Sequence, residues 1–319
     1  MNKCFTLALS GGGYKGLFSA HILVELEKQF GCPIAQKFDL IAGTSIGGII
    51  ALALALEIPA EDIEKMFLEN GKIIFKKRFF LSNGLFFKSK YAREGLYSVL
   101  EKIFGDKKIS ELKHRVLITS VNYTDGKPQM FKTPHHDMLI KDANMRIIDV
   151  AMNTSAAPMF FPINSIDEEG DFVDGGLVGN HPGFFAMFEA EKYLNQNTED
   201  IYQLHIGTIS QKFTSSSSKY VLASSFFSWR QKLFNLLFSC QEQSTNFLLH
   251  KYLGDRYYSI DSLAVENQAK KIALDKVSKT SSRILKQKGS EAVKNYLGSS
   301  HYKLLMEYKA QEFTKGSIL

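Results

Sequence analysis

A serine between two glycines is the first residue whose setting could support chemistry. Ser45 lies in the pentapeptide GTSIG, after the predicted strand 38–42 and before the apolar segment 46–56. The pattern G-x-S-x-G between a strand and a helix is typical of a nucleophile elbow, in which a sharp turn presents the serine hydroxyl at the carboxyl edge of a parallel sheet. The motif alone is weak, and a glycine-rich turn with a capping serine is the structural alternative. We predict that Ser45 is the nucleophile of an acyl-transfer reaction.

A second glycine-rich loop, GGGYKG at residues 11–16, satisfies the dinucleotide-binding pattern G-x-G-x-x-G. A dinucleotide site also requires an acidic residue at the end of the second strand, where it binds the ribose hydroxyls. Asp39 lies close to the start of that strand, and the serine motif follows its end. We therefore expect the loop to stabilise a transient oxyanion. A non-enzymatic nucleotide-binding sensor is the alternative, and covalent labelling of Ser45 would distinguish the two.

The three glycines at the start of this loop suit an oxyanion hole. Gly11, Gly12 and Gly13 end the first predicted strand, which is adjacent to the second strand in a parallel sheet. Their backbone amides can converge beside Ser45, where N–H donors stabilise the negative charge that develops on an attacked carbonyl. Lys15 either adds positive charge there or anchors the loop by pairing with an acid.

A serine nucleophile needs a base, and two residues are candidates for this role. Asp174 closes a short predicted strand in FVDGG, and the glycines after it favour presentation of the carboxylate at a sheet edge. The alternative is a turn aspartate, which is common before glycine. His181 in GNHPG is the best alternative base, and with it the chain would be a serine hydrolase of soluble esters.

Taken in order, GGGYKG, GTSIG and DGG, together with TSAAPMFFP at 154–162, resemble the motifs of the patatin-like phospholipases. The resemblance implies an α/β fold of three layers (α/β/α), with a mainly parallel central sheet and a helical C-terminal extension. It also implies a lipid acyl hydrolase in which Ser45 is the nucleophile and Asp174 its sole base partner. His181 departs from the pattern, because many members of the family have asparagine there.

A narrower resemblance concerns the segments GKPQMFKTPHH, DLIAGTSIGGIIALALAL and GDRYYSID. They look like parts of bacterial patatin-like effectors that cyclic dinucleotides switch on in anti-phage signalling. This resemblance implies a cyclic dinucleotide as activator. No metal and no other cofactor is expected.

Composition limits the class of protein and its partners. The chain has 319 residues, 45% of them hydrophobic, and a net charge of +6, so it can form a full core and favours anionic partners. The charge is too small for a DNA- or RNA-binding coat. Three widely spaced cysteines and no signal peptide indicate a cytoplasmic protein, which we expect at the inner face of the membrane when it is active. The uncharged stretch 40–56 contains three glycines and is not expected to span a membrane.

One basic and aromatic stretch, 75–93, contains six cations and no acid. Lys76, Lys77, Arg78 and Lys88 could dock on an anionic bilayer or hold a phosphate-bearing ligand. The alternative is an irregular excursion whose cations face water. An apolar helix face within 226–249 either packs on the sheet or contacts the membrane, and a homo-oligomer is expected to cover it at rest.

The periodicity predicts the order of elements and one boundary in the chain. Residues 1–212 are expected to form the catalytic core, and residues 213–319 a helical part packed on it. Strands are predicted at 5–10, 38–42, 116–121, 129–132, 171–173, 201–208 and 257–260, and helices at about 18–30, 46–56, 60–75, 94–104, 146–153 and 226–249.

Overall fold

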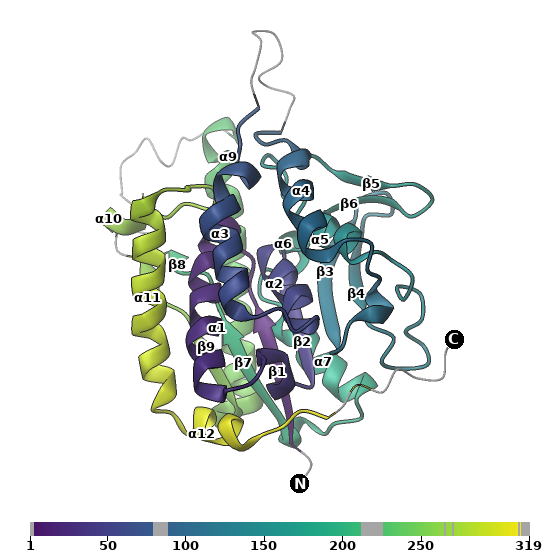
Figure 1. Cartoon of the computed structure of the whole chain (residues 1–319), viewed down its shortest axis with the longest axis vertical. Helices are drawn as coiled ribbons and strands as arrows, with labels where there is room; N and C mark the ends of the chain where they lie inside the picture. Colours follow the sequence, from purple (N-terminus) through teal and green to yellow (C-terminus); the bar gives the residue numbers. More distant parts are fainter. Residues whose placement is uncertain are drawn as a thin grey trace.

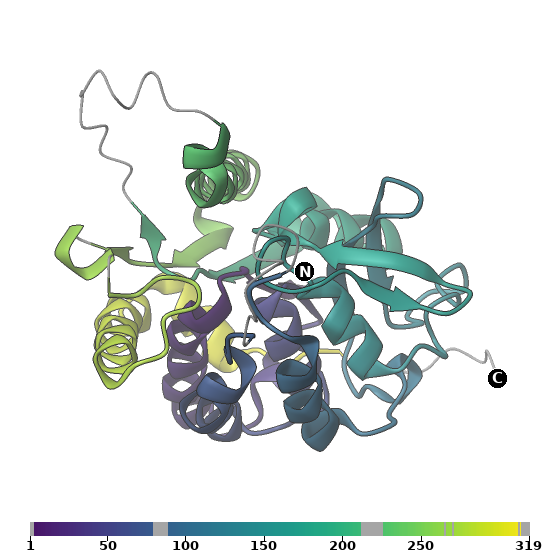
Figure 2. The ribbon, with the colours of Figure 1, turned by 90° about the horizontal axis from the view of Figure 1, so that it is seen from above.

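The computed structural model describes residues 3–78, 89–211, 226–264, 266–269, 271–311 and 313. A central sheet lies between two layers of helices (Figure 1, Figure 2). One layer contains α1 to α5 and α11, and the other contains α7 and α9. The predicted three-layer fold class is thus confirmed.

The strands of the main sheet follow the order β5-β6-β3-β2-β1-β7-β9, and β4 also pairs with β3. Neighbouring strands from β3 to β9 in this order are parallel. Strands β4 and β6 are antiparallel to β3, and β5 is antiparallel to β6. The strands are β1 (Cys4–Leu9), β2 (Leu40–Thr44), β3 (Val116–Asn122), β4 (Lys127–Lys132), β5 (Asn164–Ile166), β6 (Gly170–Asp174), β7 (Ile201–Ile206) and β9 (Tyr257–Ile260). Two further strands, β8 (Ser210–Gln211) and β10 (Leu263–Ala264), form a separate small sheet.

The helices agree with the predicted ones to within a few residues where a prediction was made. They are α1 (Gly16–Phe30), α2 (Ile46–Ala55), α3 (Ala60–Ile74), α4 (Arg93–Phe104), α5 (Ile147–Thr154), α6 (Gly176–Gly179), α7 (Gly183–Tyr193), α9 (Phe226–Leu253), α10 (Glu266–Ala269), α11 (Lys279–Leu297) and α12 (Ser300–Glu307). Every residue of α2 is buried, as its uniformly apolar sequence predicts. Across the described residues, no helix is long and apolar enough to cross a membrane.

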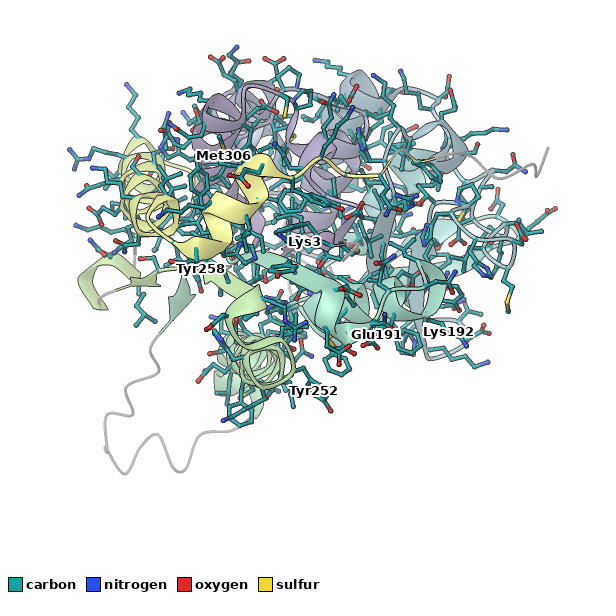
Figure 3. The ribbon with its side chains drawn as sticks, turned by 90° about the horizontal axis from the view of Figure 1, so that it is seen from below. Lys3, Glu191, Lys192, Tyr252, Tyr258 and Met306 are labelled. Carbon is teal, nitrogen blue, oxygen red and sulfur yellow. The ribbon has the colours of Figure 1, made fainter. Side chains whose placement is uncertain are left out.

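The C-terminal part of the chain completes the same sheet as the N-terminal part. Strand β9 pairs with β7 at the sheet edge. The main sheet therefore contains strands from both sides of the expected boundary between residues 212 and 213. Figure 3 shows α12, which carries Met306, at the end of the molecule where Lys3 also lies. Beyond it, the Tyr308 hydroxyl lies 2.8 Å from the carbonyl oxygen of Lys3 and 2.6 Å from Asp39 Oδ2. These contacts tie the two ends of the chain together.

Candidate active site

Ser45 occupies a strained turn between β2 and α2. Its backbone has φ 54° and ψ −124°, a conformation that non-glycine residues adopt only where the surrounding structure imposes it. The Ser45 N–H donates to Thr154 Oγ1 at 2.8 Å, which fixes the turn from α5. The geometry is that of the predicted elbow, with the side chain of Ser45 at the carboxyl edge of the sheet.

The two glycines of the motif allow α2 to pack directly on the strands. A Cβ atom on Gly43 would lie 2.4 Å from the carbonyl oxygen of Gly47. A Cβ atom on Gly47 would lie 2.2 Å from the carbonyl oxygen of Leu9 on β1. Any side chain at either position would therefore push the helix away and displace Ser45.

Asp174 lies within hydrogen-bond distance of Ser45. The Ser45 hydroxyl donates to Asp174 Oδ2 at 2.6 Å, and the N–H of Gly176 donates to Oδ1 at 2.7 Å. Burial raises the pKa of Asp174 to about 6, although both hydrogen bonds oppose this shift. The carboxylate is therefore mainly ionised at neutral pH and is a stronger base than an exposed aspartate.

Strand register brings these two residues together across β3. Thr44, next to Ser45, pairs with Thr119 on β3. The following residue of β3, Ser120, pairs with Asp174 on the antiparallel β6. The sequence indicated both chemical groups but not the antiparallel strand that places them side by side.

The glycine loop offers two backbone donors to this site. No acceptor in the described residues receives the N–H of Gly12 or Gly13, and both residues line the same cavity as Ser45. The N–H of Gly11 instead donates to the carbonyl of Asn180 at 3.2 Å. A Cβ atom on Gly11 would lie 3.1 Å from the Cβ of Ser45, so this glycine permits close approach rather than offering a free donor.

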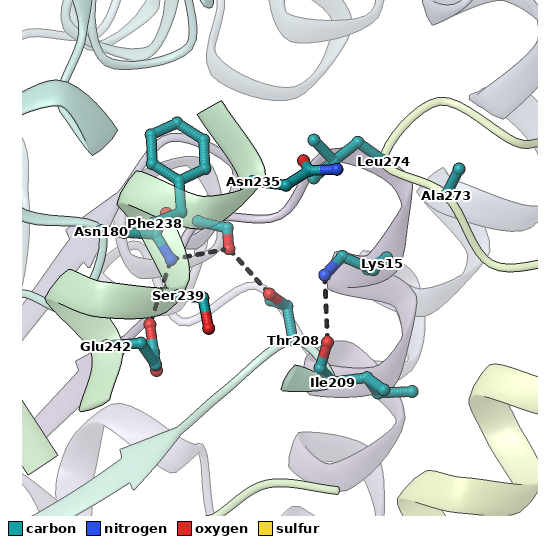
Figure 4. A pocket seen from close by; sticks show the side chains of 11 residues that line it. Lys15, Asn180, Thr208, Ile209, Asn235, Phe238, Ser239, Glu242, Ala273 and Leu274 are labelled. Atoms are coloured by element: carbon teal, nitrogen blue, oxygen red, sulfur yellow. Dashed lines mark hydrogen bonds between the residues drawn. The ribbon is translucent and has the colours of Figure 1, made fainter. Parts of the chain in front are cut away.

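Lys15 lines a second cavity, together with Gly11 of the glycine loop (Figure 4). Its Nζ donates to the carbonyl of Ile209 at 3.1 Å. Burial lowers its pKa, while the carboxylates of Asp261 and Glu242 counteract this shift. Of the two roles considered for Lys15, the structure therefore favours anchoring the loop over charging the site of Ser45.

His181 has hydrogen-bond partners other than Ser45. Its Nε2 lies 2.9 Å from the Tyr257 hydroxyl, and its Nδ1 accepts from the N–H of Gly183 at 3.0 Å. Burial holds its pKa well below the usual value. No contact of His181 with Ser45 is found among the described residues, so the geometry favours Asp174 as the base.

Glu242 on α9 is a residue of this region that the sequence did not reveal. It accepts hydrogen bonds from the Ser10 hydroxyl at 2.9 Å and from Asn180 Nδ2 at 3.1 Å, and it lies 3.0 Å from His205 Nε2. Asn180 Nδ2 also reaches the carbonyl of Gly11 at 3.4 Å (Figure 4). Glu242 thus links α9 to the glycine loop. Glu242 lies on a long helix far in sequence from the motifs of the site, and no sequence pattern linked it to them.

The ligand-type atoms of His181, His205 and Glu242 lie within 4.8 Å of one another. These side chains are buried, and their polar atoms form hydrogen bonds with neighbouring polar groups. Burial lowers the pKa of His205 to about 4, which keeps this ring neutral. The cluster is therefore a hydrogen-bonded connection between α9 and the sheet.

Ser45 opens into a hollow of about 700 Å³, part of which is open to solvent, with mostly apolar walls. Only a few polar groups, among them Ser45, Asp174 and Asn180, line it. The apolar lining consists of Ile46, Ile49, Ile74, Phe75, Leu96, Ala157, Pro158, Phe160, Phe161, Phe234, Phe238 and Leu274. Such a lining suits a ligand with a long hydrocarbon part.

The basic stretch is only partly described. Lys76 and Lys77 are exposed and Arg78 is half-buried, whereas Lys88 lies outside the described residues. Lys90, which has no acid within the stretch, forms an ion pair with Asp275 from the loop before α11.

Residues 7–187 match the family described as patatin-like phospholipase. The chain belongs to this family. It is 42% identical over 308 residues to a cGAMP-activated phospholipase of Pseudomonas aeruginosa, a match that covers 95% of this chain and 92% of that protein. A cGAMP-activated phospholipase of Vibrio cholerae is 32% identical, with coverage of 91% and 90%. A cUMP-AMP-activated phospholipase of Escherichia coli is 28% identical, with coverage of 65% of each chain.

Membership of this family makes the protein a hydrolase that acts on lipids. The match includes the glycine loop, the turn at Ser45 and the strand that ends at Asp174. The predicted family resemblance is therefore confirmed.

Proposed function

We propose that this patatin-like protein cleaves acyl esters of phospholipids through a dyad of Ser45 and Asp174. The observation that carries the proposal is the 2.6 Å hydrogen bond from Ser45 Oγ to Asp174 Oδ2. Ser45, Gly12 and Gly13 line the same apolar cavity, and the N–H groups of the two glycines have no acceptor within the described part of the chain. A base, a nucleophile and two candidate oxyanion donors thus line one cavity.

In the first step, Ser45 Oγ attacks the ester carbonyl while Asp174 accepts its proton. The carbonyl oxygen becomes an oxyanion, and the N–H groups of Gly12 and Gly13 stabilise it. The C–O bond to the glycerol part then breaks, and the lysolipid alcohol leaves with the proton held by Asp174. In the second step, Asp174 takes a proton from water, the hydroxide attacks the acyl-enzyme, and Ser45 regains its proton as the fatty acid leaves.

Labelling by a fluorophosphonate, together with hydrolysis of phospholipid vesicles, tests this proposal. The intact protein should bind one fluorophosphonate at Ser45 and release fatty acid and lysolipid. Ser45→Ala should lose both properties. Ser98→Ala, at a half-buried serine on α4 outside the cavity, is the matched control and should keep both. Hydrolysis that survives in Ser45→Ala would refute the assignment.

A cyclic dinucleotide is the proposed activator, and an anti-phage defence response is the proposed setting. The support is that curated relatives are named cGAMP-activated or cUMP-AMP-activated phospholipases. Vesicle hydrolysis should therefore rise when a panel of cyclic dinucleotides is added one at a time, with linear dinucleotides as controls. Equal rates with and without every member of the panel would contradict activation.

The proposed location is the cytoplasm, with reversible attachment to the inner face of the membrane and assembly into a homo-oligomer. The support is a charge of +6 and exposed apolar residues on α7 and α9, among them Phe188, Phe247 and Tyr252. Light scattering with and without vesicles and activator would test both points.

A further inference from the structure

A groove on the outer surface of the helical layer runs between α3 and α4. Its hollow of about 880 Å³, part of which is open to solvent, has Ile49 and Ala53 of α2 at its base. Figure 1 shows α2 between these two helices. The remaining apolar residues of the groove are Ile58, Ile63, Met66, Val99, Ile103 and Phe104.

The groove adjoins the active-site cavity along α2. Ile49 lines both hollows, so its side chain forms the partition between them. Helix α3 runs toward the site and ends at Ile74, and α4 begins near the site with Leu96 on its first turns. Ile74 and Leu96 belong to the wall of the active-site cavity. The two helices therefore flank an apolar path that Ile49 divides into two hollows.

The dimensions of this path suit a lipid acyl chain. Seven residues separate Ile46 from Ala53, which corresponds to roughly 10 Å along the helix axis. One acyl chain spans half of the hydrocarbon core of a bilayer, or roughly 15 Å. The charged residues that line the groove are Asp62, Lys65, Glu69 and Lys102. Of these, Asp62, Lys65 and Glu69 belong to α3 and are exposed. The path thus has an apolar floor and a charged rim, the arrangement expected for a hydrocarbon chain lying beneath water.

We infer that the α3–α4 groove binds the distal part of the substrate's acyl chain, which enters it past Ile49. This inference rests on the proposed function, because it assumes that the chain's carbonyl end is bound at Ser45. It predicts a preference for long acyl chains. Each methylene that is buried changes affinity roughly fourfold, so loss of the distal subsite should be visible as a change in chain-length preference.

Filling the groove tests the inference. Ala53→Leu places bulk on the floor, and Ile103→Trp, at a half-buried position of α4, fills the distal part from the opposite side. In either variant, the ratio of kcat/KM for a palmitoyl ester to that for a hexanoyl ester should fall more than about tenfold, because several methylenes lose their site. Glu101→Trp, on the same helix but exposed and outside the groove, should leave the ratio unchanged. An unchanged ratio in both groove variants, with folding verified by circular dichroism, overturns the inference.

A covalent probe locates the chain directly. The probe is a long-chain alkyl fluorophosphonate with a diazirine at its terminal carbon, and it is allowed to react with the wild-type protein before irradiation. Mass spectrometry should find the second attachment on residues of α3 or α4 that line the groove, such as Met66 or Ile103. Attachment elsewhere, with Ser45 modified, refutes the groove but leaves the proposed function intact. Absence of modification at Ser45 refutes the proposed function, and the inference with it.

Discussion

At the scale of single residues, the chemistry depends on the contact between Ser45 Oγ and Asp174 Oδ2. The strained backbone of Ser45 points its hydroxyl at the carboxylate, and burial gives that carboxylate a higher proton affinity than it would have in water. A carboxylate is nevertheless a weak base for an alcohol. The N–H groups of Gly12 and Gly13 must therefore supply much of the transition-state stabilisation.

Replacement of Asp174 by asparagine tests the base. Asp174→Asn keeps the shape of the side chain and can still accept from the N–H of Gly176, but its amide cannot take the proton of Ser45. Ester hydrolysis should fall by at least about two powers of ten, the usual contribution of a positioned general base. The melting temperature should stay close to that of the wild type. A variant with nearly normal kcat would show that another group acts as base.

The pH dependence of hydrolysis follows from the same carboxylate. Only the ionised form of Asp174 can accept a proton, and its pKa is raised to about 6. As the pH falls through this value, kcat/KM for a soluble ester should fall about tenfold per pH unit. The measurement is a rate profile over a range in which circular dichroism shows the protein folded. A rate that stays constant to well below this pKa would exclude Asp174 as the base.

At the scale of elements, the sequence predicted which segments form strands and helices better than it predicted how the strands pair. The apolar run before Gly11 and the uniformly apolar residues of α2 could be assigned because both patterns have a local cause. The antiparallel placement of β6 beside β3 could not be assigned. Strand pairing of this kind depends on packing between distant segments, which periodicity does not encode.

The same limitation applies to the residues that support the glycine loop. Leu274 accepts a hydrogen bond from the N–H of Tyr14 at 2.6 Å, and Glu242 binds Ser10 and Asn180 from α9. Both supporting residues come from the C-terminal third of the chain and belong to no recognisable motif. The chemical groups of the site were therefore predictable from the sequence, whereas the contacts that hold them were not.

The glycine loop itself can be tested at Gly12. A Cβ atom there would lie 2.3 Å from Thr208 Oγ1, so Gly12→Ala must displace the loop and, with it, the N–H groups of Gly12 and Gly13. We expect kcat to fall by roughly two to three powers of ten, as for a damaged oxyanion hole, with little change in KM. Gly298→Ala is the matched control, because a Cβ atom there meets nothing closer than 3.7 Å. A normal kcat in Gly12→Ala would argue against an oxyanion role for this loop.

At the scale of the whole molecule, the question is how a protein without a described membrane-spanning helix reaches a lipid substrate. Its charge of +6 favours an anionic surface. The exposed Lys76 and Lys77 directly follow α3, whose last residue, Ile74, lines the active-site cavity. Contact of this segment with a bilayer would therefore bring the cavity close to the lipids.

Charge removal in the basic stretch tests this docking. Each cation near an anionic surface contributes on the order of 1 kcal/mol, so a variant in which Lys76, Lys77, Arg78 and Lys88 are all glutamine should bind anionic vesicles much more weakly. The binding that remains should depend less on salt, because fewer charge–charge interactions are left for salt to screen. Hydrolysis of a short soluble ester should be unchanged, since the dyad is untouched.

Unchanged vesicle binding would exclude docking through these cations. Normal vesicle binding combined with loss of activation by a cyclic dinucleotide would assign them to a phosphate-bearing ligand instead.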